Sequence, residues 1–138
     1  MLRVLSIIFF LTPLIGAAEQ SKPNLGVTMY GSFLHSSHVE NVLFFFDKIE
    51  KNDSFEMRKA LRNHKIDTLI LSSPGGSVFE GLQMAGIIFD RKLTTYIPKD
   101  ATCASACSFM FFAGQHRVSE GRLGVHQFFS GAGQQNKK

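Results

Sequence analysis

The chain has 138 residues, which suits one domain with one hydrophobic core and leaves little room for a second. Its 15 lysines and arginines exceed its 11 aspartates and glutamates by 4, but the longest basic run is the terminal Lys137-Lys138 pair. Nucleic-acid binding needs a clustered basic face. The composition therefore argues against a nucleic-acid partner and indicates a solvated surface of mixed charge.

Residues 1–18, MLRVLSIIFFLTPLIGAA, have the features of an export signal. Arg3 precedes an apolar stretch, and the small residues Gly16 and Ala18 stand where a signal peptidase cleaves. The stretch has about 15 residues and is interrupted by a proline, whereas a bilayer span needs roughly 20. We therefore expect cleavage after Ala18, a mature chain that begins at Glu19, and a periplasmic or secreted protein. The rival interpretation is an uncleaved signal that holds the protein at the membrane.

The first part of the mature chain predicts one strand and two helices. Residues 25–33 alternate in part between apolar and polar residues, which favours a strand. Ser36 or Ser37 can cap a helix through residues 38–51, where apolar residues recur at helical spacing. Residues 54–63 predict a further short helix.

The middle of the chain predicts a strand, helix, strand unit of the parallel type. Residues 66–73 and 93–98 are apolar runs typical of strands that are buried on both faces. Between them, Ser77 and Glu80 have the spacing of a capping box at the start of a helix. That helix carries an apolar stripe that we expect to face the core, formed by Val78, Leu82, Ala85 and Phe89. An α/β fold follows, with a parallel sheet and flanking helices.

Ligands of open parallel sheets bind beyond the carboxyl ends of the strands. The segments SPGGS (73–77) and KDATCAS (99–105) follow the two buried strands, so we expect them to be neighbours. The glycines allow a sharp turn and bring bare N–H groups close to a ligand, which makes Gly75 a candidate for binding an oxyanion. The alternative is a turn that is present for steric reasons alone.

The segment TCASACSFMFFAG (102–114) places Ser105 where a loop should turn into a helix. A serine in this position can serve only as an N-cap, and it becomes a nucleophile when a base accepts its proton. The candidate base is His126 in RLGVHQ, a short strand-like stretch that places the histidine 21 residues after Ser105. The alternative for His126 is a histidine that pairs with a backbone carbonyl.

Cys103 and Cys107 are four residues apart. Within a regular helix this spacing leaves the Cβ atoms about 5–6 Å apart, whereas a disulfide prefers about 3.5–4.5 Å. Because Cys103 should precede the helix, the loop can close this gap, and export favours oxidation. The alternative is two small buried thiols. Zinc is less favoured because no second close ligand pair accompanies the cysteines.

Three segments occur in the order SSPGGSVFEGL, CASACSFMFFAG and RLGVHQ. Together they resemble the Clp protease proteolytic subunit branch of the ClpP/crotonase superfamily, and in particular exported, Clp-like bacterial proteins. The resemblance covers residues 25–130 and leaves a polar tail at 131–138. It implies a serine peptidase site in which Ser105 attacks a carbonyl and His126 is the base. The N–H groups of Gly75 and Ala106 would hold the oxyanion, and no metal or nucleotide cofactor is needed.

The sequence departs from this family after His126. Family proteases take a catalytic aspartate from well beyond the histidine, but no Asp or Glu follows His126 here. Asp100 or Glu120 can orient His126 only if the fold brings one of them close. We also expect the C-terminal part of the family's fold, which mediates its oligomerisation, to be missing, so oligomer formation stays open.

Two leading functions and a weaker third one follow from these observations. The first is an exported serine hydrolase, most simply a peptidase that acts on a peptide or protein. The second is a catalytically inactive Clp-like module, or truncated relative, that binds an extended peptide along a sheet edge. Acyl-thioester chemistry of the crotonase kind is a weaker third reading, because the serine and histidine pair argues against it.

Overall fold

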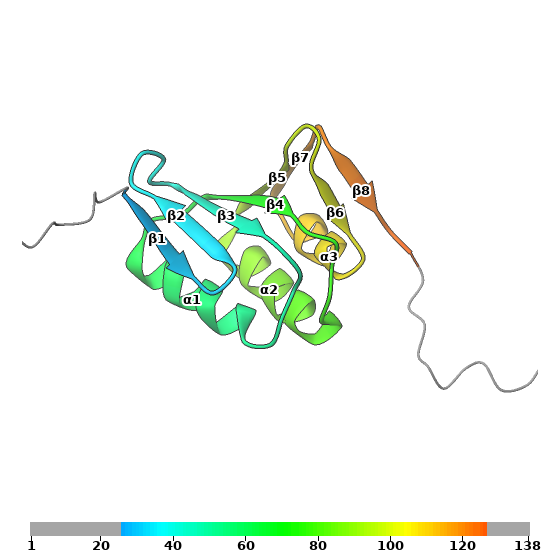
Figure 1. Cartoon of the computed structure of the whole chain (residues 1–138), viewed down its shortest axis with the longest axis horizontal. Helices are drawn as coiled ribbons and strands as arrows, with labels where there is room; N and C mark the ends of the chain where they lie inside the picture. The colour runs from blue at the N-terminus through cyan, green and yellow to red at the C-terminus, as the bar shows by residue number, and fades with distance from the viewer. Residues whose placement is uncertain (1–25, 127–138) are drawn as a thin grey trace, which may run out of the picture.

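The computed structural model describes residues 26–126, so the expected signal sequence (1–18) and polar tail (131–138) lie outside the described residues. A six-stranded sheet forms the centre of the fold, and the helices lie on one side of it (Figure 1). The elements in chain order are β1 (Val27–Tyr30), β2 (Phe33–Ser36), β3 (Val42–Phe46), α1 (Asp53–Asn63), β4 (Thr68–Ser72), α2 (Val78–Arg91), β5 (Thr94–Ile97), β6 (Thr102–Ala104), α3 (Ala106–Phe112), β7 (His116–Ser119) and β8 (Arg122–Gly124).

The sheet has the strand order β1-β2-β3-β4-β5-β7. The first three strands pair antiparallel, and β3, β4, β5 and β7 pair parallel. The predicted α/β fold and its parallel β4-α2-β5 unit are therefore confirmed. The short helix predicted at 54–63 is also confirmed as α1.

The start of α2 differs in detail from the predicted capping box. Ser77 Oγ accepts the N–H of Glu80 at 3.3 Å, as the spacing predicts. The Glu80 carboxylate turns away from its own helix, however, and accepts the N–H groups of Asn52 at 3.1 Å and Ser54 at 2.9 Å at the start of α1. One helix thus caps the other. Burial acts to raise the pKa of Glu80, but these amide donors and the charge of Arg58 hold it below its ordinary value.

The helix predicted over residues 38–51 is wrong, because β3 occupies its centre. β3 lies between β2 and β4, and it buries Leu43 and Phe45 completely. The run VLFFF consists of β-branched and large apolar residues that fill the two faces of a sheet, and this packing overrides the helical spacing. Neither Ser36 nor Ser37 caps a helix, since Ser36 ends β2 and Ser37 lies in the following turn.

The single strand predicted at 25–33 is also wrong. A turn at Gly31 and Ser32 divides this region into β1 and β2, which pair as an antiparallel hairpin. Gly31 has a φ of 55°, in the left-handed region that glycine adopts at little cost.

The apolar stripe predicted for the core side of α2 mostly faces outward. The exposed fraction is 39% for Val78, 53% for Leu82 and 72% for Phe89. The side of α2 that packs in the core carries Gly81, Met84, Ile87 and Ile88 instead. Because α2 is apolar on two sides, its periodicity alone does not identify the buried one.

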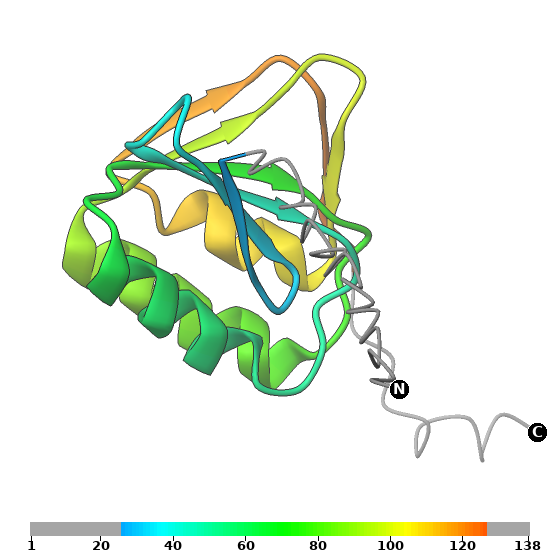
Figure 2. The ribbon, with the colours of Figure 1, turned by 60° about the vertical axis from the view of Figure 1, so that its left-hand side comes forward.

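A second, two-stranded sheet of β6 and β8 stands beside the main one, with its strands parallel (Figure 2). β8 coincides with the strand expected around RLGVHQ, whereas β6 and β7 were not predicted. α3 packs against α2, β5 and β6. Among the described residues, no helix has both the length and the apolar character needed to cross a bilayer.

Candidate active site

The segments expected to be neighbours do lie side by side: SPGGS follows β4, and its Ser73 pairs with Cys103 of β6 within KDATCAS. The N–H of Ser73 donates to the Thr102 carbonyl at 2.7 Å, and the N–H of Ala104 donates to the Ser73 carbonyl at 3.0 Å. A Cβ placed on Gly75 would lie 2.7 Å from the Cβ of Ser105 and 3.1 Å from the backbone nitrogen of Ala106. The structure therefore brings Gly75, Ser105 and Ala106 into one site, and the backbone of Gly75 packs directly on the turn that carries Ser105.

Ser105 lies between β6 and α3 in a strained backbone conformation, with φ 55° and ψ −125°. A residue with a Cβ rarely adopts this region, and such strain occurs where the surroundings hold it in place. Here the N–H of Ser105 donates to the Gly124 carbonyl at 2.9 Å. Its carbonyl accepts from the N–H of Ser108 at 2.9 Å and from the Ser108 hydroxyl at 2.6 Å. The sharp turn from strand to helix resembles the elbow that presents the nucleophilic serine in α/β-hydrolases.

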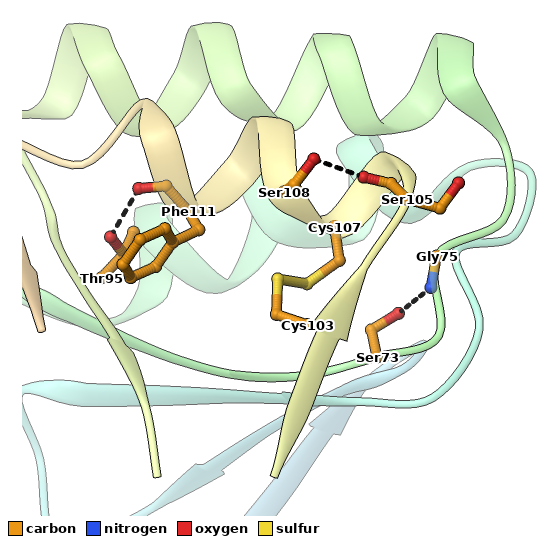
Figure 3. Close-up of a disulfide and its surroundings, with 8 residues drawn as sticks. All are labelled: Ser73, Gly75, Thr95, Cys103, Ser105, Cys107, Ser108 and Phe111. Carbon is orange, nitrogen blue, oxygen red and sulfur yellow. Dashed lines mark hydrogen bonds between the residues drawn. A yellow bond between two sulfur atoms is a disulfide. The ribbon is translucent and has the colours of Figure 1, made fainter. Parts of the chain in front are cut away.

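The side chain of Ser105 does not act as a helix cap. Ser105 occupies the N-cap position of α3, but its side chain makes no capping hydrogen bond. The residue is half-buried. Figure 3 shows its hydroxyl pointing away from α3, on the side where Gly75 lies. The interpretation of Ser105 as a mere N-cap therefore loses its structural basis.

Cys103 and Cys107 are joined by a disulfide that brackets Ser105 (Figure 3). Their Cα atoms are 5.3 Å apart, within the usual range for a disulfide. Cys103 lies in β6 and Cys107 in the first turn of α3, so the bond crosses the strand-to-helix turn. Both residues are fully buried. The bridge fixes the two ends of the segment that carries the strained serine.

The N–H of Gly75, an expected oxyanion donor, already has a partner within the loop. It donates to Ser73 Oγ at 3.1 Å. Figure 3 shows the Gly75 nitrogen directed toward Ser73 and away from the Ser105 hydroxyl. Ala106 is the first residue of α3, so its N–H precedes the intrahelical hydrogen bonds and remains available to a ligand.

His126 follows β8 at the end of the small sheet where Ser105 lies. The register pairs Gly124 with Ala104, one residue before Ser105, and His126 is two residues further along the chain. Its side chain is exposed. β8 thus delivers the histidine and the Gly124 carbonyl that binds Ser105 to the same end of the sheet.

The two acidic candidates for orienting His126 lie at the opposite end of the small sheet. Asp100 precedes β6 and Glu120 precedes β8, whereas Ser105 and His126 follow these strands. The Glu120 carboxylate is engaged with Tyr96 of β5, where it raises the pKa of that phenol. This placement argues against Asp100 or Glu120 as the residue that orients His126.

Two residues of the site were missed by the sequence analysis. The Ser73 hydroxyl accepts a hydrogen bond from the Gly75 N–H, and the Gly124 carbonyl accepts one from the Ser105 N–H. A serine whose hydroxyl accepts the N–H two residues on is typical of a turn, so the order Ser-Pro-Gly carried a usable signal for Ser73. The role of Gly124 depends on the register between β6 and β8, which no local pattern encodes.

The comparisons with known proteins relate this fold to the Clp proteases. No protein-family model matches the chain, and no curated protein matches it. A ClpP1 mutant from Listeria monocytogenes has a TM-score of 0.55 at 22% identity, covering 64% of this chain and 57% of its own. The ClpP protease catalytic domain from Plasmodium falciparum has a TM-score of 0.55 at 24% identity, covering 67% of this chain and 57% of its own. The chain therefore has a ClpP-like fold and spans just over half the length of these two structures.

Proposed function

We propose that the protein is an exported serine hydrolase, most simply a peptidase, in which Ser105 is the nucleophile and His126 the general base. The N–H groups of Gly75 and Ala106 form the oxyanion hole. The observation that carries the proposal is the strained backbone of Ser105, which the disulfide and three hydrogen bonds hold beside Gly75. The likeness to ClpP protease structures supports the same reaction class.

The chemistry proceeds in two half-reactions. The Ser105 oxygen forms a bond to the carbonyl carbon of the substrate while its proton passes to His126. Collapse of the tetrahedral intermediate breaks the bond to the leaving amine, which receives that proton from His126, and leaves an acyl group on Ser105. Water then repeats the sequence with His126 as base and releases the acid. Each oxyanion donor is worth about 3–4 kcal/mol in the enzymes where it has been measured.

A fluorophosphonate probe tests the nucleophile, because it reacts quickly only with an activated serine. Ser105→Ala and His126→Ala should each abolish labelling of the folded protein. We expect slow labelling of the unmodified protein, since a poorly oriented imidazole costs about four orders of magnitude in rate. Labelling that survives Ser105→Ala would place the reactive group elsewhere.

The control serine should have no contact with the elbow. Ser108 is unsuitable, because its hydroxyl donates to the Ser105 carbonyl at 2.6 Å and its loss loosens the same turn. Ser119 is exposed in β7, and its hydroxyl bonds only locally, to the Gly121 carbonyl. Ser119→Ala should therefore leave labelling unchanged.

The second candidate is a catalytically inactive module that binds an extended peptide beside the SPGGS loop. Two observations favour it: the Gly75 N–H is engaged within the loop, and neither Asp100 nor Glu120 lies at the His126 end of β8. A folded wild-type protein that never labels but binds peptides would support this candidate.

Export is part of the proposal and has a separate test. The apolar segment 4–18 and the small residues before Glu19 predict cleavage after Ala18. N-terminal sequencing of the protein from the cell envelope should begin at or near Glu19. An intact Met1 form embedded in the membrane would contradict this part alone.

A further inference from the structure

The Gly75 N–H is a buried donor that needs a partner whether or not a ligand is present. Gly75 is buried, and an unpaired N–H in such a place is costly. Ser73, which is 2% exposed, supplies the partner through its hydroxyl oxygen at 3.1 Å. The proposed catalytic function requires the same N–H to point at the reacting carbonyl instead.

The backbone on either side of this N–H is anchored by backbone hydrogen bonds, whereas the N–H itself is held by the Ser73 side chain. Ser73 is held to β6 by its hydrogen bonds with Thr102 and Ala104, as described above. The carbonyl of Gly75 accepts the N–H of Ile49 at 2.8 Å. The Pro74–Gly75 peptide between these anchors can rotate about ψ of Pro74 and φ of Gly75.

Glycine permits this rotation because it has no Cβ to obstruct it. The φ of Gly75 is 95°, in a region that glycine adopts about as readily as negative φ. The backbone of Gly75 already packs against Ser105 and the Ala106 nitrogen. A rotation that carries the N–H away from Ser73 therefore turns it toward the Ser105 side.

We propose that Ser73 is a positioning residue that holds the Gly75 N–H in the resting protein and yields it to the oxyanion during reaction. This inference rests on the proposed hydrolase function. Ser73 touches no reacting atom, and it acts through Gly75. The hydrogen bond to Ser73 keeps the buried N–H paired at rest, and its loss is part of the cost of reaching the transition state.

The rate of fluorophosphonate labelling tests this competition. Ser73→Ala removes the competing acceptor, so labelling should become about 2-fold to 10-fold faster, the range that one neutral hydrogen bond spans. The same substitution should lower the thermal unfolding temperature, because the N–H then lacks its partner. If Ser73 had a purely structural role, its substitution would lower both the unfolding temperature and the labelling rate. Ser73→Thr keeps the hydroxyl and should label at the wild-type rate.

A spectroscopic measurement on the unmodified protein covers the case in which Ser73→Ala does not fold. In ¹⁵N-labelled protein, the Gly75 amide proton should exchange slowly with solvent, and its resonance should move downfield when the phosphonyl oxygen replaces Ser73 as acceptor. A Gly75 resonance that does not move on labelling would overturn the proposal.

The outcomes separate this inference from the function on which it rests. If the wild type labels and folded Ser73→Ala labels at an equal or slower rate, the proposed role of Ser73 is refuted while the hydrolase function is not. Absence of labelling in both folded proteins would refute the hydrolase, and the role of Ser73 with it. Faster labelling of Ser73→Ala, together with the moving resonance, supports both.

Discussion

Ser105→Gly should make the protein more stable while it destroys the proposed activity. The φ of 55° and ψ of −125° cost a residue with a Cβ about 1–3 kcal/mol, and glycine does not incur this cost. Glycine has more conformational freedom in the unfolded chain, which lowers the free energy of unfolding by about 0.5–1 kcal/mol and partly offsets the relief of strain. The net increase in the free energy of unfolding is about 1 kcal/mol, or about 4–5 °C in Tm for a domain of this size.

The matched control is Ser105→Ala, which removes the same hydroxyl but keeps a Cβ and therefore the strain. Thermal unfolding of the wild type and both variants, with the disulfide intact, isolates the backbone contribution. Ser105→Ala should stay close to the wild type, and Ser105→Gly should unfold at a higher temperature. If Ser105→Gly is no more stable than Ser105→Ala, the elbow holds no strain and the main support for a catalytic Ser105 is lost.

Three further predictions follow from neighbouring features. Reduction of the Cys103–Cys107 bridge should lower the free energy of unfolding by about 2 kcal/mol for a loop of this length and slow probe labelling, and the double variant Cys103→Ala with Cys107→Ala should do the same. Urea unfolding with and without reductant measures the loss of stability. An unchanged urea midpoint would contradict a stabilising bridge. Gly75→Ala should lower Tm and abolish labelling because its Cβ would lie 2.7 Å from a backbone oxygen, whereas Gly86→Ala, whose Cβ meets nothing within 4 Å, should be neutral or stabilising. Burial and a neighbouring histidine lower the pKa of His64, so the unfolded chain takes up a proton before the folded protein does as pH falls. The urea midpoint should therefore be highest at pH values above 6.5, the ordinary pKa of histidine, and should decrease at lower pH. A decrease of the same size in His64→Gln would show that His64 does not cause it.

The parallel core of the fold could be predicted because its signals are local. The apolar run of β4, the glycine turn and the cap at Ser77 all fall within one short stretch of sequence. β3 could not be predicted in this way. VLFFF becomes a strand because β2 and β4 flank it, and the residues of VLFFF themselves carry no trace of these partners.

For the candidate site, the sequence indicated which residues gather but not how they bond. Gly75 and Ser105 lie together because parallel strands end at the same edge of a sheet, a rule of topology that the sequence analysis could apply. The engagement of the Gly75 N–H by Ser73 depends on the rotation of a single peptide group. The distance of Glu120 from His126 depends on where β8 begins and ends. The order Ser-Pro-Gly indicates a turn at Ser73 but not the direction of the Gly75 N–H, and the position of Glu120 has no signature in residue type or spacing.

The carboxylate of Glu80 makes the two crossover helices a single cooperative unit of folding. The amides of Asn52 and Ser54 at the start of α1 have their acceptor only when α2 is docked beside it, since Glu80 belongs to α2. A partly folded chain with α1 formed and α2 detached would leave these amides and the carboxylate to water. The amides of Asn52 and Ser54 should therefore exchange hydrogen with the solvent at the rate at which α2 opens, so that the beginning of one helix reports on the attachment of the other.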